Sequence, residues 1–197
     1  MTGWSNITSR AYLLAAANID TDQIIPASFL TTTTRSGLGR YAFAQWRFDA
    51  DGNERVECPL NDSNLTGASI IVGGANFGCG SSREHAAWAL QDFGIRVVIS
   101  SQIADIFKSN AIKNGIAPVE ISESEHACLV ESLRRDPGLE IAVSLTEQTV
   151  RWHDHVVHFT LEAFGCRCLM EGLDPLGWLL RMDSHIAAYE EKSACMP

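Results

Sequence analysis

The sequence lacks several features that define large classes of proteins. No apolar stretch reaches the roughly 18 residues that a bilayer-spanning helix needs, and residues 1–5 lack the basic-then-apolar order of a signal peptide. Basic residues are few: 15 Lys and Arg stand against 24 Asp and Glu, a formal net charge of −9. Because nucleic-acid binding needs clustered basic side chains, this balance argues against it. We therefore expect a cytoplasmic protein with neither nucleic acid nor membrane as a partner.

Cysteine spacing suited to a metal is also missing. No Cys-x-x-Cys pair occurs, and Cys166-x-Cys168 is poor spacing for a structural zinc or an iron–sulfur cluster. In a chain expected in the cytoplasm, scattered cysteines do not indicate a disulfide framework. We expect this chain to bind no metal, so that any cluster the protein uses belongs to another chain. The six cysteines are Cys58, Cys79, Cys128, Cys166, Cys168 and Cys195.

The order of apolar runs and helical patterns predicts the fold class. With 197 residues, 46% of them hydrophobic, the chain is long enough to bury a core. Strands and helices alternate through the middle of the chain, which predicts a parallel sheet, and strands dominate the part after it. We therefore predict an α/β domain with a mostly parallel central sheet and an accessory β-rich part. The expected strands cover 10–16, 69–72, 96–100, 116–121, 140–144, 149–152 and 156–161, and the expected helices 84–93, 103–113, 123–134 and 175–190.

The most informative segment is 73–90, where glycines at 73, 74, 78 and 80 precede two serines and a helix. Such glycines allow positive φ and close approach of another molecule to the backbone. Ser81 or Ser82 is the predicted N-cap, and the free N–H groups of the first turn, with the helix dipole, favour an anion. Arg83 adds a two-pronged donor for a carboxylate. The alternative is an ordinary capped strand–turn–helix.

These residues favour one kind of chemistry over another. A serine hydroxyl is a weak base unless N–H groups and a guanidinium stabilise its alkoxide. No Gly-x-Ser-x-Gly elbow is present, so proton abstraction beside a carboxylate fits Ser81 and Arg83 better than acyl transfer. Glu84 has two interpretations, a functional carboxylate or a first-turn acid that complements the dipole. His85 likewise has a functional interpretation and one as a packing or capping residue.

Three polar segments need a structural interpretation. Asp20-Thr21-Asp22 lacks the Gly and Glu of a calcium loop, so we expect a turn whose carboxylates bond backbone N–H groups or meet an arginine. Residues 31–39 contain four threonines without periodicity and end in glycine, which predicts a mobile loop. His153-x-His155-x-x-His158 is typical of an exposed hairpin turn and not of a zinc site.

Several segments resemble a known family, the small subunits of 3-isopropylmalate dehydratase. The resemblance is carried by Asn18-Ile-Asp-Thr-Asp-Gln-Ile-Ile-Pro26, Asn76-Phe-Gly-Cys-Gly-Ser-Ser-Arg-Glu-His85 and Ala104-Asp-Ile-Phe107 with Lys113-Asn-Gly115. It implies an aconitase-like swivelling β/β/α domain over residues 1–197. That domain would comprise N-terminal strands and a mobile loop (1–65), an α/β centre (66–138), and a C-terminal hairpin and helix (139–197).

The resemblance also implies a reaction and roles for residues. It predicts a hydro-lyase of leucine biosynthesis that is active only with a large subunit carrying a 4Fe–4S cluster, as a heterodimer or a higher assembly. The substrates are 2-isopropylmalate and 3-isopropylmalate, interconverted by dehydration and rehydration. Ser81 matches the catalytic base and Arg83 the arginine that grips a carboxylate. The expected substrate-binding residues are Arg35, Ser82, Thr31 and Thr32, and the residues expected to support them are Asp22, Glu84 and His85.

Alternatives stay open at this point. The threonine run at 31–34 departs from the family's pattern at a loop that faces the variable substituent, so a related hydro-lyase acting on homoaconitate, methylmalate or dimethylmalate is one alternative. A non-catalytic or RNA-binding relative of aconitase is another, which the acidic charge and intact Ser81 and Arg83 disfavour. A carboxylate-binding protein that acts alone is the last.

Overall fold

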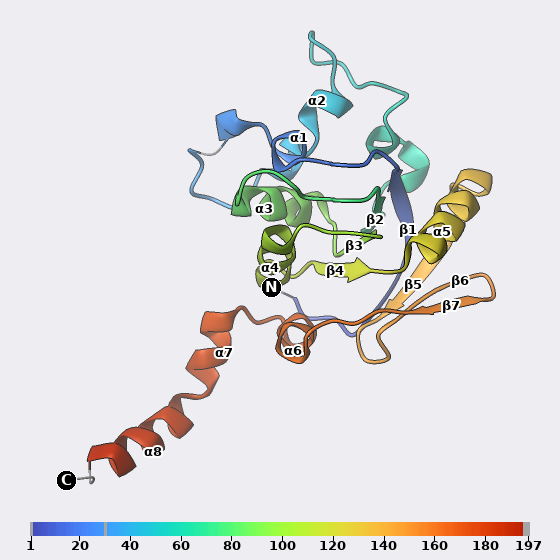
Figure 1. Cartoon of the computed structure of the whole chain (residues 1–197). Helices are drawn as coiled ribbons and strands as arrows, with labels where there is room; N and C mark the ends of the chain where they lie inside the picture. Colours follow the sequence, from blue (N-terminus) through green and yellow to red (C-terminus); the bar gives the residue numbers. More distant parts are fainter. Residues whose placement is uncertain (1, 30, 195–197) are drawn as a thin grey trace.

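A single seven-stranded sheet forms the centre of the molecule (Figure 1). The computed structural model describes residues 2–29 and 31–194, so Cys195 lies outside the described residues. The strand order is β4-β3-β2-β1-β5-β6-β7. The strands are β1 (Asn6–Leu14), β2 (Ile70–Gly73), β3 (Val97–Ser100), β4 (Ala117–Glu120), β5 (Glu140–Ser144), β6 (Thr149–Trp152) and β7 (His155–His158).

Strand β1 joins two halves of different kinds. It pairs with β2 in parallel, Ala11 opposite Ile70, and with β5 antiparallel, Asn6 opposite Ser144. On one side β2, β3 and β4 continue in parallel, and on the other β5, β6 and β7 continue antiparallel. The predicted α/β class with a parallel sheet is therefore confirmed, and the accessory β-rich part is an extension of that same sheet.

Helices cover both faces of the parallel half, as buried parallel strands require. Alternate residues of β2 point to opposite faces: Ile71 packs in one hydrophobic cluster with Leu90 and Phe107, and Ile70 and Val72 pack in another with Leu129. The α-helices are α1 (Thr21–Ile24), α2 (Ala44–Arg47), α3 (Glu84–Phe93), α4 (Asp105–Lys113), α5 (Glu123–Arg135), α6 (Ala163–Glu171), α7 (Pro175–Arg181) and α8 (Asp183–Ala194).

Helix ends follow local signals where those signals are strong. Gly94 and Gly115 follow α3 and α4 with φ of 108° and 79°, in the left-handed region where glycine is favoured. The start of α3 differs from the prediction: its N-cap is Arg83, whose side chain makes no capping hydrogen bond, and not Ser81 or Ser82. The two serines instead lie in the turn before the helix, because that turn is bonded to another segment of the chain.

The C-terminal part departs most from the sequence prediction. Helix α6 was not expected; Glu162 caps it by accepting hydrogen bonds from the N–H groups of Phe164 and Gly165, a role that glutamate seldom takes. The single expected terminal helix is divided into α7 and α8 at Met182. These two helices extend away from the sheet (Figure 1), and Arg181 ties α7 to α6 through Glu171 at 2.8 Å.

Candidate active site

Two segments far apart in the sequence lie side by side at the end of β2. The backbone N–H of Gly78 donates to the carbonyl of Ile19 at 2.7 Å, and that of Thr21 donates to the carbonyl of Cys79 at 2.9 Å. Asp20 and Cys79 form an isolated parallel bridge between the same segments. The glycine-rich turn and the Asn18–Pro26 segment, the two longest stretches of the family resemblance, therefore form one structural unit.

Glycine is required at two places in this turn. Gly78 has φ of 73°, and a Cβ there would lie 2.3 Å from Cγ of the buried Phe107 ring. Gly80 has φ of 91°, and a Cβ there would lie 2.5 Å from Oδ2 of Asp20. At Gly78 both the backbone conformation and the space disfavour a side chain, and at Gly80 the positive φ does. The turn thus carries Ser81 to the surface on a backbone that favours glycine.

Thr21 holds the backbone of Ser81 in place through two hydrogen bonds. Its hydroxyl donates to the Ser81 carbonyl at 3.1 Å and accepts from the Ser81 N–H at 3.2 Å, and Thr21 itself is only 1% exposed. Ser81 is exposed, and among the described residues its own hydroxyl makes no hydrogen bond. The structure therefore fixes the position of Ser81 while leaving its hydroxyl free to face a second molecule.

Asp22 and Arg83 form an ion pair across the two segments. Asp22 is the second residue of α1, whose N-cap Asp20 accepts a hydrogen bond from the Asp22 N–H at 2.6 Å and forms a capping box with Gln23. The Arg83 side chain is 17% exposed. The prediction that these carboxylates bond backbone N–H groups or meet an arginine is confirmed. Arg83 is thus oriented by Asp22 next to Ser81.

Glu84 lies at the start of α3 between charged and amide groups. It accepts a hydrogen bond from Nδ2 of Asn114 at 3.0 Å, and Nη2 of Arg35 lies 3.9 Å from its Oε1. Burial alone would raise the pKa of Glu84, but the Asn114 bond and the charges of Arg35 and Lys113 outweigh burial and lower that pKa. Glu84 is therefore ionised at neutral pH and attracts Arg35 to the site.

The polar segment 31–38, which we call the Arg35 loop, is attached to α3. Nε2 of His85 lies 2.8 Å from the carbonyl oxygen of Thr32, and the Arg35 guanidinium lies 5.3 Å from the ring centroid of Trp88. At the other end of the loop, Oδ2 of Asp92 accepts hydrogen bonds from the N–H groups of Gly37 and of Gly39, just after the loop, at 2.9 and 2.7 Å. The structure thus brings this loop to the same helix that Arg83 begins.

The predicted site residues are mostly together. Ser81, Arg83 and Asp22 form one group, and Arg35, Glu84 and His85 form a second along the first turn of α3. The Ser82 carbonyl accepts from Nδ2 of Asn110 at 3.4 Å. Thr31 and Ser82 are exposed, and no side-chain hydrogen bond is recorded for either hydroxyl among residues 2–29 and 31–194. All assigned roles in binding and catalysis stay predictions.

Several site residues were not predicted from the sequence. Thr21 looked like part of a polar turn, and Asp92 like one polar position of a helix. Asn114 stands in the Lys113-Asn-Gly115 stretch of the resemblance without an assigned role, although it is 2% exposed and bonds Glu84. Burial of a polar side chain without an obvious partner in the sequence is the signal that distinguishes Thr21 and Asn114, and it becomes visible only in the folded chain.

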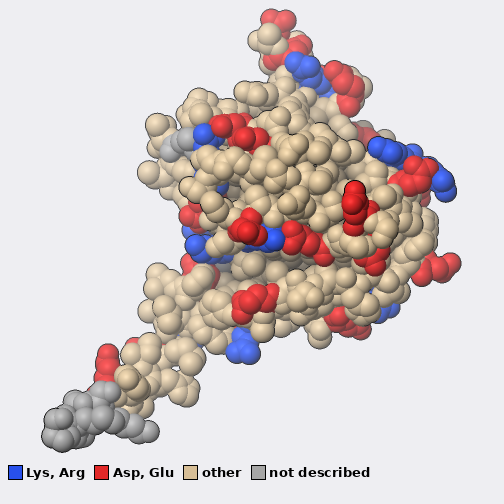
Figure 2. Space-filling model, in the orientation of Figure 1, with Lys and Arg blue, Asp and Glu red and all other residues tan. Residues whose placement is uncertain are grey.

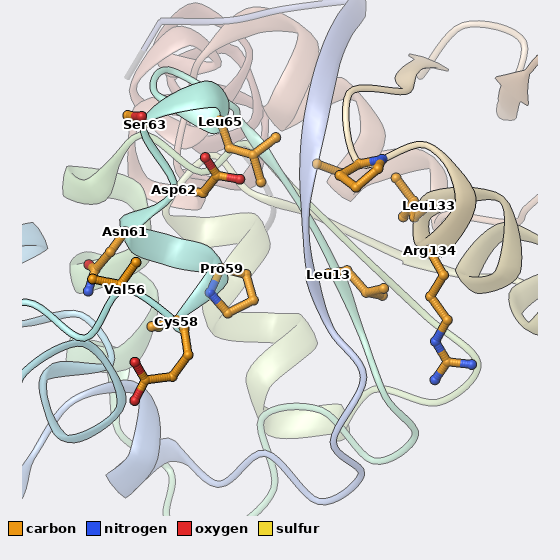
Figure 3. A pocket seen from close by; sticks show the side chains of 13 residues that line it. Leu13, Val56, Cys58, Pro59, Asn61, Asp62, Ser63, Leu65, Leu133 and Arg134 are labelled. Carbon is orange, nitrogen blue, oxygen red and sulfur yellow. The ribbon is translucent and has the colours of Figure 1, made fainter.

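A cavity of about 580 Å³ lies elsewhere on the molecule (Figure 3). It is bounded by β1, by the 3₁₀ helices Pro59–Asn61 and Ser63–Leu65, and by the end of α5. The apolar part of the cavity wall includes Leu13, Leu65 and Leu133, and its polar part includes Asp62 and Arg134. None of the predicted site residues lines this cavity. Ser81 is exposed, and the predicted site lies on a different part of the surface from this cavity.

Within residues 2–29 and 31–194, no three His, Cys, Asp or Glu side chains are grouped so that they could hold a metal ion. His155 and His158 are exposed in the β6–β7 hairpin, as predicted. In the part of the chain that the structure describes, none of the helices has the length and hydropathy to cross a membrane. Figure 2 shows acidic and basic side chains interspersed on the drawn face, without a broad basic patch.

Comparison with known families defines the class of the protein. Residues 6–124 match the family described as the aconitase C-terminal domain, and this range includes every residue named at the site. The fold and the Ser81–Arg83 turn are therefore those of an aconitase-type domain.

The relatives narrow the class to one family. The 3-isopropylmalate dehydratase small subunit of Chloroflexus aurantiacus is 48% identical over 187 residues, which cover 94% of this chain and 93% of that one. Its counterpart in Anaeromyxobacter dehalogenans is 49% identical over 185 residues, 93% of this chain and 95% of that one. A crystal structure of 3-isopropylmalate dehydratase from Methanocaldococcus jannaschii matches with a TM-score of 0.68 at 25% identity, over 93% of this chain and 99% of that one. The chain belongs to the family of 3-isopropylmalate dehydratase small subunits, as the resemblance predicted.

Proposed function

We propose that this chain is the small subunit of a 3-isopropylmalate dehydratase, a hydro-lyase that interconverts 2-isopropylmalate and 3-isopropylmalate in leucine biosynthesis. The observation that carries the proposal is the pairing of an exposed Ser81 hydroxyl with an oriented Arg83 guanidinium before the N-terminus of α3. A base and a carboxylate-binding group two positions apart in one turn suit removal of a proton next to a carboxylate. The identities to the named relatives support this particular substrate.

Ser81 is the proposed base. In its deprotonated form the Ser81 oxygen takes the proton from the substrate carbon and returns it during rehydration. The positive end of the α3 dipole and the Arg83 guanidinium favour the negatively charged form of that oxygen. Thr21 fixes the Ser81 backbone through two hydrogen bonds, so that the oxygen stays within reach of the substrate carbon.

Arg83 is the proposed carboxylate clamp. Asp22 pairs with the Nη1 atom of Arg83, and the other nitrogens of the fork remain for a substrate carboxylate. Negative charge builds up on that carboxylate as the proton leaves, so a fixed guanidinium stabilises the transition state more than the ground state. Asp22 acts through Arg83 and does not need to touch the substrate.

The Arg35 loop is the proposed contact with the rest of the substrate. Arg35 is assigned to the second carboxylate, and Thr31, Thr32 and Ser82 to the surroundings of the substituent. Glu84 and His85 hold this loop near the start of α3. An isopropyl group needs room and apolar or weakly polar neighbours, and the threonine side chains of this loop can provide them.

The partner of this chain supplies what its own residues do not. We propose a heterodimer in the cytoplasm with a large subunit that carries a 4Fe–4S cluster, and a single swivel-type domain over residues 1–197. When bound by that subunit, the cluster would supply a Lewis acid for the departing hydroxyl. The single domain is supported by β1, which pairs with strands from the centre and from the C-terminal part of the chain. Closure of the two subunits would exclude water and strengthen the interactions of Arg83.

The test is anaerobic dehydratase activity of the two subunits together, followed by the absorbance of the alkylmaleate intermediate. We expect turnover of isopropylmalate that requires both chains, is lost in Ser81→Ala and is kept in the exposed-serine control Ser63→Ala. Preferred turnover of methylmalate or homocitrate would assign a different acid to the same mechanism. A folded complex with an intact cluster that turns over none of these acids would refute the enzymatic proposal. Tight substrate binding by this chain alone would favour the carboxylate-binding alternative.

A further inference from the structure

Both ends of the Arg35 loop are attached to one face of α3. Nε2 of His85 lies 2.8 Å from the Thr32 carbonyl oxygen, and Asp92 accepts hydrogen bonds from the N–H groups of Gly37 and Gly39. His85 and Asp92 stand seven positions apart in the helix. Since an α-helix has about 3.6 residues per turn, the two side chains lie on the same face, two turns apart. The loop therefore runs along the helix between these two attachments.

The attachment at Asp92 depends on the shape of the backbone. One carboxylate oxygen, Oδ2, accepts both hydrogen bonds, at 2.9 and 2.7 Å. Gly39 lies so close to α3 that a Cβ there would be 2.5 Å from the backbone nitrogen of Phe93. Gly37 has φ of 87° with open space around it, so its requirement is conformational. The two glycines let the chain come close enough for two N–H groups to converge on one anion.

Arg35 lies between the two attachments, and its guanidinium is positioned by residues of α3. The guanidinium is 5.3 Å from the Trp88 ring centroid and 3.9 Å from Glu84, both residues of α3. The same helix begins at Arg83, and its buried residues Ala86, Ala87, Ala89 and Leu90 pack it into the core. Helix α3 therefore has the Asp22–Arg83 ion pair at its start. Along its length it has the two residues that hold the loop, His85 and Asp92. The attachments at His85 and Asp92 therefore determine where Arg35 lies relative to Ser81.

We propose that Asp92 is a positioning residue: it latches the Arg35 loop to α3 and thereby sets the place of Arg35 relative to Ser81 and Arg83. The inference rests on the proposed function for the substrate role of Arg35. Asp92 touches no substrate in this scheme. Its removal frees the C-terminal end of the loop, and Arg35 then spends most of its time away from the carboxylate it binds.

The latch is tested first in the full chain without any substrate, by trypsin cleavage after Arg35. Asp92→Ala should raise the rate at which the peptide ending in Arg35 appears by about tenfold, since a freed loop is cut more readily than an anchored one. The matched control is Asp49→Ala, which removes a similar carboxylate away from the Arg35 loop. Oδ1 of Asp49 also accepts two backbone hydrogen bonds, from the N–H groups of Asp51 and Asn53 at 2.9 and 2.8 Å. A wild-type cleavage rate in Asp92→Ala would overturn the latch.

The positioning role is tested by kinetics of the complex with the large subunit. Asp92→Ala should raise KM about tenfold and change kcat by less than about threefold, the pattern of lost substrate binding. Asp92→Asn, which keeps an acceptor oxygen, should recover most of the affinity. In an Arg35→Ala background, Asp92→Ala should raise KM no further, because it acts through Arg35.

Two results separate the possible failures. An equal rise of KM in both backgrounds would show that Asp92 acts independently of Arg35 and would refute the positioning role. Absence of turnover by the wild-type complex would refute the proposed function and, with it, the role of Asp92 toward the substrate. The cleavage rate after Arg35 decides in either case whether Asp92 anchors the loop.

Discussion

Substitution of Thr21 by valine tests the connection between the two segments of the site. Valine keeps the shape of threonine and fills the same buried space, since Thr21 is 1% exposed. It removes the hydroxyl that bonds both the carbonyl and the N–H of Ser81, at 3.1 and 3.2 Å. The variant therefore changes two hydrogen bonds to the proposed base and little else.

The structure sets the size of the expected effect. Each hydrogen bond contributes about 0.5–1.5 kcal/mol net, and the exposed Ser81 can regain part of it from water, so we expect a loss of about 1–2 kcal/mol. In a chain of this length that corresponds to a fall of about 2–8 °C in Tm. A freed Ser81 is also misplaced relative to the substrate, and a shift of about 1 Å lowers kcat by up to about 100-fold.

The assay combines thermal unfolding of the chain with anaerobic kinetics of the two-subunit complex. Thr21→Ser keeps the hydroxyl and should retain most of kcat, and Thr149→Val changes a second buried threonine (2% exposed) outside the predicted site. If Thr21→Val matches the wild type in both Tm and kcat, the reasoning about these bonds is wrong. Loss of Tm with an unchanged kcat would restrict Thr21 to a role in the fold.

Three further predictions concern the same region. Gly78→Ala places a Cβ against the Phe107 ring at positive φ, so we expect a loss of about 2–4 kcal/mol in unfolding free energy, measured in urea with an unchanged m value. Asp22→Asn removes the charge that orients Arg83 and should raise KM about tenfold in steady-state kinetics, while the ion pair contributes less than about 1 kcal/mol to stability because the Asp22 carboxylate is half-exposed. The lowered pKa of Glu84 means that its carboxylate stabilises the fold above the usual pKa of 4.5 and that this contribution is lost as the pH falls through the lowered value. The Tm advantage of the wild type over Glu84→Gln should accordingly shrink as the pH falls from 4.5 through the lowered pKa of Glu84.

The sequence predicts those parts of the fold whose signals are local. Buried runs such as 96–100 and the glycines after α3 and α4 determine strands and helix ends through residues that are close in the chain. Helix α6 escapes prediction because Gly165 weakens its helical pattern and its cap is a glutamate. The N-cap of α3 differs because tertiary bonds from Thr21 keep Ser81 outside the helix, although serine is a good cap by itself.

The candidate site is predictable in its residue types and not in its contacts. Ser81, Arg83 and Asp22 are conspicuous as a group of polar residues in glycine-rich or turn-forming segments. The bonds of Thr21 to Ser81 and of Asp92 to Gly37 join residues more than 50 positions apart, and no local pattern specifies such pairs. Which side chain anchors a loop is decided by how the elements pack, so these contacts need the folded chain.

The position of β1 also has a consequence for how the chain is made. β1 precedes the other described strands along the chain and is the middle strand of the finished sheet, whereas its partner β5 begins only at Glu140. Until Ser144 has emerged, the edge of β1 that pairs with β5 has no partner, so the protein cannot complete its fold strand by strand during translation. The wide separation of paired residues predicts slow folding and an aggregation-prone nascent chain. Removal of the C-terminal third is therefore expected to leave the N-terminal strand with an unpaired edge.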